Sequence, residues 1–131
     1  MPLAQDLISY GDGGFRRKRL NSAGVRRLTT ASALIHTVAA GAGRTHLTDI
    51  LITNITAGAI TATVRIVASG GADDATSDIM TALSVPANDF KFIRFGDMGL
   101  ALEAGDTIKA LASANTSLNI LLGGRAEITT S

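Results

Sequence analysis

The 131-residue chain has no cysteine and no tryptophan, and it has only one tyrosine, four phenylalanines and two prolines. Without cysteine it can form no disulfide, no thiolate metal site and no cysteine nucleophile. Because aromatic residues are scarce, the core must consist mainly of isoleucine, leucine, valine and alanine, and little aromatic surface is left for stacking on bases or sugars. The length and a hydrophobic content of 46% predict one domain that folds by packing alone.

Long apolar runs are also missing. No stretch of the sequence reaches the length needed to span a bilayer, and residues 1–14 lack the basic and then apolar pattern of a signal peptide. We therefore expect a soluble protein that is neither inserted in a membrane nor processed.

The most regular pattern in the sequence lies between residues 45 and 69. Apolar residues occupy alternate positions from Ile60 to Ala68, which is the period of a strand with one buried face. Residues 47–56 are rich in isoleucine and threonine and are apolar on both faces, as expected for a central strand. Small residues at 57–59 join the two segments, so the sequence predicts a hairpin in the middle of a sheet.

The rest of the chain from residue 28 also consists of short strand-like segments separated by turn residues, without a sustained helical period. Further strands are expected at residues 33–38, 79–85, 90–95, 100–102, 107–112 and 117–128. The Phe-rich strand 90–95 is expected to be well packed, and the two glycines at 123–124 predict a bulge in the last strand. About eight antiparallel strands predict an all-β, jelly-roll-like β-sandwich, with an immunoglobulin-like sandwich as the structural alternative.

Charge is unevenly distributed along the chain. Residues 1–27 contain six basic and two acidic residues, a net charge of +4, whereas residues 28–131 contain six basic and nine acidic residues, a net charge of −3. The basic residues of the first segment are Arg16, Arg17, Lys18, Arg19, Arg26 and Arg27. Because glycines interrupt this segment and its cations need anions or water, we predict an extended basic N-terminal arm at residues 1–27, ahead of a β-sandwich domain at residues 28–131.

Three roles are open for the arm: binding to nucleic-acid phosphates, docking on an acidic protein surface, or no role beyond that of a solvated tail. The arm has few basic and almost no aromatic residues, so binding to nucleic acid would be weak and sensitive to salt. Protein docking and the solvated tail are therefore preferred, and nucleic acid is not expected as a partner.

No constellation of residues predicts catalysis or a metal centre. His36 and His46 lack the spacing and the acidic neighbour of a metal site, and neither has the context of a catalytic triad. Asp73, Asp74 and Asp78 lack the alternating oxygen ligands of a calcium loop. The chain is accordingly expected to have no enzymatic activity, no catalytic residue, no cofactor and no metal.

Several short patterns together resemble a known class of protein. Residues 35–41 end in Val-Ala-Ala-Gly, and residues 47–55 end in Thr-Asn-Ile before the small-residue corner. Val-Pro-Ala-Asn at residues 85–88 and Leu-Glu-Ala-Gly-Asp-Thr-Ile at residues 102–108 follow in the same order. Over residues 33–128 this order resembles small virion proteins of tailed bacteriophages, a resemblance that implies a non-enzymatic and commonly trimeric β-sandwich.

The resemblance implies a capsid decoration (cement) protein that binds the outer surface of a tailed-phage head and stabilises it. The expected partners are the major capsid protein and further copies of the chain in a homotrimer. No association with a membrane is expected. The expected location is the virion surface, after synthesis in the host cytoplasm. In this interpretation the basic arm docks on the capsid, since a segment of this length extends up to roughly 90 Å. A tail or head fibre, or a receptor-binding component, is the alternative.

Overall fold

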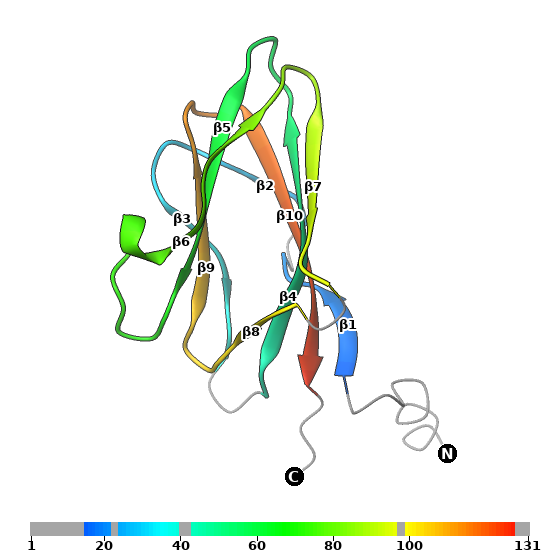
Figure 1. Ribbon diagram of the computed structural model, residues 1–131, viewed down its shortest axis with the longest axis vertical. Coiled ribbons are helices and arrows are strands. Elements are labelled where there is room, and N and C mark those ends of the chain that lie inside the picture. The colour runs from blue at the N-terminus through cyan, green and yellow to red at the C-terminus, as the bar shows by residue number, and fades with distance from the viewer. Residues whose placement is uncertain (1–14, 22–23, 40–42, 97–98, 128–131) are drawn as a thin grey trace.

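The computed structural model describes residues 15–21, 24–39, 43–96 and 99–127 of the chain. Its elements, shown in Figure 1, are β1 (Phe15–Arg19), β2 (Arg26–Arg27), β3 (Ala33–Thr37), β4 (Thr45–Asn54), β5 (Ile60–Val67), the short 3-10 helix η1 (Ala75–Ser77), β6 (Asp78–Val85), β7 (Phe90–Arg94), β8 (Leu100–Leu102), β9 (Thr107–Ala112) and β10 (Leu118–Glu127). No helix within these ranges is long and apolar enough to cross a membrane.

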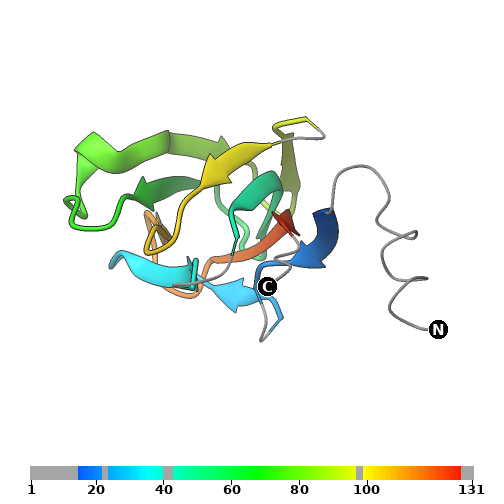
Figure 2. The ribbon, with the colours of Figure 1, turned by 90° about the horizontal axis from the view of Figure 1, so that it is seen from below.

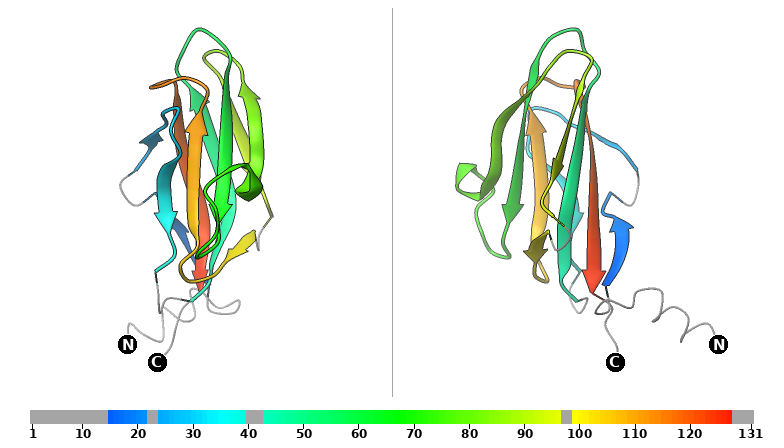
Figure 3. Two further views of the ribbon diagram at one scale, coloured as in Figure 1. Left: turned by 90° about the vertical axis from the view of Figure 1, so that its left-hand side faces the viewer. Right: turned by 45° about the vertical axis from the view of Figure 1, so that its right-hand side comes forward.

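Two antiparallel sheets face each other, as Figure 3 shows from two sides. The first sheet has the order β1-β10-β4-β7, with β2 also paired to β10 and β8 also paired to β4, and the second has the order β3-β9-β5-β6. Because β1 and β2 pair with successive parts of β10, and β7 and β8 with successive parts of β4, each pair acts as one interrupted edge strand. The segments therefore fill two layers of four strands, and the predicted all-β, jelly-roll-like sandwich is confirmed.

Alternating side chains from both sheets form the core. In β9, Ile108 and Ala110 are buried and the residues beside them are half-buried. In β10, Ile120 and Leu122 are buried on either side of the half-buried Leu121. The bulkiest fully buried side chains are Leu20, Leu28, Val38, Leu47, Ile50, Ile52, Val64, Leu102, Ile108, Leu118, Ile120 and Leu122. The core of the described ranges is therefore aliphatic, as the composition predicts.

The hairpin predicted from residues 47–56 and 60–68 is wrong. β4 pairs with β10, β7 and β8 in the first sheet, whereas β5 pairs with β6 and β9 in the second. The buried side chain of Asn54 explains the change of sheet, because its Nδ2 donates to the carbonyl oxygens of Gly58 at 2.8 Å and of Val85 at 3.0 Å. These bonds hold the corner in a form that carries the chain from one layer to the other.

The bulge predicted in the last strand is present. The pairing of β10 with β4 shifts its register between Gly123 and Gly124. A Cβ atom at Gly124 would lie 2.6 Å from the carbonyl oxygen of His46 and 2.9 Å from the side chain of Leu20. Glycine therefore allows both β4 and the residue that follows β1 to approach β10 closely.

Part of the segment predicted as an extended arm pairs with the first sheet. β1 and β2 are antiparallel to β10, and the end-on view in Figure 2 shows β1 at the side of β10. Leu20 and Leu28 are buried in the core. The buried Asn21 donates to the carbonyl oxygen of Ile120 at 3.0 Å and accepts from the amide of Leu122 at 2.8 Å. Backbone pairing and packing therefore hold the described residues after Phe15, while residues 1–14 lie outside the described ranges.

Candidate assembly surface

The outward face of the first sheet carries its side chains in rows that cross the strands. The strand register aligns one row, which consists of Arg19, Gly123, Asp49 and Arg94. The next row along the strands consists of Leu121, Leu51 and Phe92. Their neighbours Ile50, Ile52 and Leu122 point into the core, so these two rows lie on the outside of the sandwich. A charged row thus lies beside an apolar row.

The two rows line a groove with a volume of about 450 Å³. Its lining includes three arginines, Arg19, Arg94 and Arg125, and one carboxylate, that of Asp49. Gly123 leaves space in the middle of the groove for the side chain of Asp49. A Cβ atom at residue 123 would come within 2.2 Å of Oδ1 of Asp49. The described lining of the groove therefore combines charged side chains with an apolar floor.

β7 forms an edge of the first sheet, and no strand of the described ranges pairs with its outer side. Its register with β4 runs without interruption from Phe90 to Arg94. The side chains of Phe90 and Phe92 are 58% and 54% exposed. A regular edge strand with unpaired backbone groups and exposed apolar side chains is a template for pairing with another chain.

The edges of the second sheet are less regular. In β6, Ala82 has a φ of +49°, and the register between β5 and β6 shifts on both sides of Val64. In β3, the register with β9 shifts between Leu34 and His36. Such bulges twist an edge away from a regular ladder and oppose pairing with another chain. Among these three edges, β7 is therefore the one best suited to association.

The cationic residues predicted to form a docking arm lie at the opposite edge of the first sheet. Residues 16–19 belong to β1, and Arg19, the residue of β1 whose side chain the structure describes, lines the groove. Arg26 donates from Nη1 to the carbonyl oxygen of Leu34 at 3.1 Å, and Arg27 donates from Nε to Oδ1 of Asn119 at 3.3 Å. Arg26 and Arg27 thus contact the sandwich itself. The side chains of Arg16, Arg17 and Lys18 lie outside the described part of the structure.

The sequence reasoning missed the surface on β7. It predicted a well-packed Phe-rich strand, but Phe90 and Phe92 are exposed. Ile93, which lies between Phe92 and Arg94, is half-buried. The alternation of Phe90, Phe92 and Arg94 on one side of the strand was the available signal. The register between β7 and β4 decides which face of β7 points outward. The sequence of β7 alone does not contain this register.

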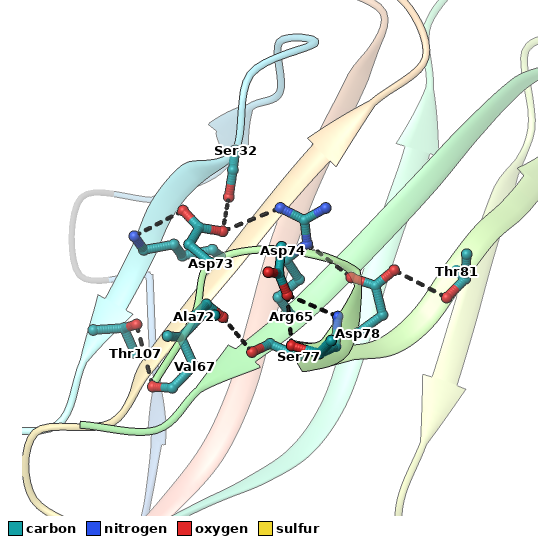
Figure 4. Close-up of polar contacts among 12 residues, drawn as sticks. Ser32, Arg65, Val67, Ala72, Asp73, Asp74, Ser77, Asp78, Thr81 and Thr107 are labelled. Atoms are coloured by element: carbon teal, nitrogen blue, oxygen red, sulfur yellow. Dashed lines mark hydrogen bonds and ion pairs between the residues drawn. The ribbon is translucent and has the colours of Figure 1, made fainter. Parts of the chain in front are cut away.

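A separate network of charges fastens the loop before β6 to the outer face of the second sheet (Figure 4). Asp73 accepts hydrogen bonds from Ser32 at 2.8 Å, Lys109 at 3.0 Å and Arg65 at 3.1 Å. Arg65 also donates from Nε to Oδ1 of Asp78 at 2.7 Å. The carboxylates considered above as calcium ligands are thus engaged by cations and hydroxyl groups, and the described residues contain no group of three or more His, Asp or Glu that could hold a metal ion.

The charge network shifts the ionisation of its members. The hydrogen bond from Lys109, supported by Ser32 and Arg65, holds the pKa of Asp73 below its ordinary value. Hydrogen bonds from the side chain and amide of Thr76 lower the pKa of Asp74. The hydrogen bond to Asp78 raises the pKa of Arg65. All these shifts favour the charged forms, which fits a structural role for the network.

Comparisons with known proteins identify a similar fold. No family model matches the chain, and no curated protein matches it. A solved structure of Bacillus endospore appendages, described as a family of disulfide-linked pili, is similar with a TM-score of 0.52 and 12% sequence identity, over 91% of this chain and 93% of that chain. At this identity the similarity establishes the fold alone.

This comparison corrects the interpretation drawn from short sequence patterns. The predicted capsid decoration protein is wrong, and so is the predicted location on a virion, because the matching structure is a subunit of spore appendages that form pili. The comparison gives no support to the major capsid protein as a partner. Of the two functions considered, a fibre component is nearer to the comparison, since a pilus is itself a filament assembled from copies of its subunits.

Proposed function

We propose that this chain is a structural, non-enzymatic subunit that associates with copies of itself to build a filament or surface appendage. The observation that carries the proposal is the regular edge strand β7, with Phe90 and Phe92 exposed beside an unpaired backbone edge. The similarity of the fold to that of a pilus-forming protein supports it over nearly the whole chain.

Backbone pairing and the burial of apolar surface would both drive association through β7. An added strand would pair with the backbone of β7 and cover the two phenyl rings. Complete burial of a fully exposed phenylalanine side chain contributes about 1.5–3 kcal/mol, and about half of that is available from each of these rings, since they are 58% and 54% exposed. Two rings at each contact offset part of the entropy lost on association, and repetition of the contact along a filament holds each subunit at two sites.

The symmetry of the contact decides between a filament and a closed oligomer. If β7 of one copy meets a different surface of the next, the contact is heterologous and can repeat without closing. If the rotation between copies closes after three subunits, the result is a homotrimer. We propose the open arrangement, because the two edges of the first sheet carry different residues: β7 exposes Phe90 and Phe92, while β1 and β2 are rich in arginine.

Disulfide bonds cannot link copies of this chain. The chain contains no cysteine, so the disulfide links of the pili in the comparison have no counterpart here. Assembly of this protein is therefore expected to be indifferent to reducing agents and to depend on concentration.

The test is assembly of the purified chain, followed by sedimentation and negative-stain electron microscopy. We expect the parent protein to form elongated particles as its concentration rises. The double variant Phe90→Asp/Phe92→Asp should remain a folded monomer, because it places negative charge along the β7 edge. Leu34→Asp is the matched control, since Leu34 is 47% exposed on β3 and its replacement should leave assembly intact.

Two outcomes would contradict the proposal. One is a discrete trimer or monomer of the parent at every concentration. The other is unchanged assembly of the Phe90→Asp/Phe92→Asp variant, which would move the contact to another surface.

A further inference from the structure

The first sheet has a second edge opposite β7, and β2 forms one part of it. Among the described strands, only β10 pairs with β2. Neighbouring strands across this sheet are antiparallel: β2 to β10, β10 to β4, and β4 to β7. Since three antiparallel steps separate them, β2 and β7 run in opposite directions. When two copies lie side by side in the same orientation, β7 of one therefore meets β2 of the next as an antiparallel neighbour, and the contact can repeat without closing.

The β2 edge carries side chains that complement those of β7. The register through β10 and β4 places Arg27 in the same row as Phe90, on the outward face of the first sheet. Nε of Arg27 donates to Oδ1 of Asn119 at 3.3 Å, so the side chain of Arg27 lies along this face. Val25, two positions before Arg27, is 59% exposed. A guanidinium group is attracted to the face of a phenyl ring, so β2 offers a cation and an apolar side chain where β7 offers two rings.

Charge restricts the register between two such copies. If their rows were level, Arg94 would lie beside Arg19 of the next copy, because these two residues are the ends of one row. Lys91 would likewise lie beside Arg26 of the next copy. Like charges that lie directly opposite each other destabilise a strand pair. The level register is therefore disfavoured.

A shift of two positions keeps the outward faces aligned, since side chains alternate along a strand. In one direction, the shift brings Arg26 of the next copy beside Ile93. Arg94 then lies beside Val25 of the next copy, so neither like-charge pair forms. In the other direction, Arg94 comes level with residue 17 of the next copy, which is a further arginine. The charges therefore favour the first direction alone.

We propose that β7 of one copy pairs with the β2 edge of the next copy in this shifted register. Phe92 stacks on the guanidinium group of Arg27 of the next copy, and the stem of Arg94 lies along Val25 of the next copy. Each copy is displaced from the last by about 7 Å along the strands, which is the rise of two residues. This inference rests on the proposed function, because it names the surface that receives β7.

The absence of cysteine from the chain provides a test without background. The single-cysteine variant Arg94→Cys is mixed with affinity-tagged Val25→Cys at a concentration at which the parent assembles, and the mixture is oxidised. Residues directly opposite in an antiparallel pair have Cβ atoms about 4.5–5.5 Å apart, close to the spacing that a disulfide needs. This design leaves Phe92 and Arg27 in place.

The rate of mixed-dimer formation on a non-reducing gel measures the contact. We expect Val25→Cys to cross-link with Arg94→Cys about tenfold faster than Ser84→Cys does, because the contact raises the effective concentration of the two thiols. Ser84→Cys is the matched control, since Ser84 is exposed on β6. Arg19→Cys reports the level register, in which residue 19 would lie beside residue 94. It should cross-link no faster than the control.

A second measurement tests the role of Arg27. Arg27→Ala should raise the concentration at which assembly begins about threefold, as expected for the loss of an exposed contact between a cation and a ring. Its denaturation midpoint in urea should match that of the parent, since the hydrogen bond from Arg27 to Asn119 is solvent-exposed. Arg44→Ala is the matched control, because it removes the same charge from an exposed side chain that pairs with Glu103. The control should leave the onset of assembly unchanged.

The possible results separate this inference from the proposed function. Faster cross-linking of Arg94→Cys with Arg19→Cys than with Val25→Cys would overturn the shifted register. Cross-linking of Arg94→Cys with itself at the highest rate would show that β7 pairs with β7, and would also overturn the inference. If none of the pairs exceeds the control while assembly still depends on Phe90 and Phe92, the inference fails and the proposed function stands. A parent chain that does not assemble would overturn both.

Discussion

The carboxylate of Asp49 lies over Gly123 of the neighbouring strand, at a place where a Cβ atom on residue 123 would come within 2.2 Å of Oδ1. The two residues belong to the row that runs from Arg19 to Arg94 across the first sheet. Gly123 therefore has two roles: it precedes the register shift of β10, and it leaves room for the one carboxylate among the described residues that line the groove.

The first prediction concerns this contact. Gly123→Ala should force the Asp49 side chain to rotate away and should lower the free energy of unfolding by about 1 kcal/mol, the lower end of the cost of overpacking. Asp49→Ala in the same chain should recover most of the loss. Urea denaturation measures both changes. Gly58→Ala is the control, because a Cβ atom there meets nothing within 4 Å, and equal stability of the two alanine variants would contradict the prediction.

The second prediction concerns the corner between the sheets. Asn54→Ala removes the side-chain donor to two carbonyl oxygens, those of Gly58 and Val85. Since Asn54 is buried, we expect a loss of about 2–3 kcal/mol in the free energy of unfolding. Asn119→Ala is the matched control, because Asn119 makes a solvent-exposed hydrogen bond to Arg27 and its loss should cost less than about 0.5 kcal/mol. Similar denaturation midpoints for the two variants would refute this role of Asn54.

The third prediction concerns acid stability. The pKa of Asp73 is lowered in the folded chain below its ordinary value of 3.8, so on acidification the unfolded chain takes up the proton first. Above the ordinary pKa of 3.8, the network around Asp73 therefore contributes its full stabilisation to the folded chain. This stabilisation is lost as the pH falls below 3.8 through the folded-state pKa.

The variant Asp73→Asn tests this sign. It should be less stable than the parent at neutral pH, and the difference should shrink as the pH falls below the ordinary pKa of an aspartate. Salt should also narrow the difference at neutral pH, because Asp73 is partly exposed and its ion pairs are screened. Thermal unfolding at several pH values measures the effect. A difference that widens in acid would have the wrong sign.

Most of the fold could be predicted from single-strand patterns. The strands found as β3 to β10 lie close to the segments predicted from alternation and turn residues, and the double glycine correctly predicts the bulge in β10. β1 and β2 were missed because four consecutive cations at residues 16–19 show no alternation. Only Leu20 and Leu28, buried after each segment, indicate contact with the core.

The site could not be predicted in the same way, because it depends on register. Arg19, Asp49 and Arg94 are far apart in the sequence and meet only through the pairing of four strands. The resemblance to virion proteins failed for a related reason. The short patterns that carried it, such as the Thr-Asn at residues 53–54, coincide with strand ends and corners of a jelly roll, and proteins with different assemblies can share that fold.

The last prediction concerns the proposed contact between copies at β7. Phe90→Ala and Phe92→Ala, as single variants, should each raise the concentration at which assembly begins about tenfold, which corresponds to about 1.4 kcal/mol. Each variant removes one of the two exposed phenyl rings that an added strand would cover. Light scattering measures the onset, and Leu34→Ala on β3 is the matched control.

The pattern of the variants separates the surfaces. If the onset of assembly is unchanged in both phenylalanine variants but raised in Leu34→Ala, the contact between copies uses the edge of the second sheet and not β7. A raised onset in both phenylalanine variants with an unchanged onset in Leu34→Ala agrees with pairing at β7, because Phe90 and Phe92 lie on the same face of that strand and a partner strand would cover both.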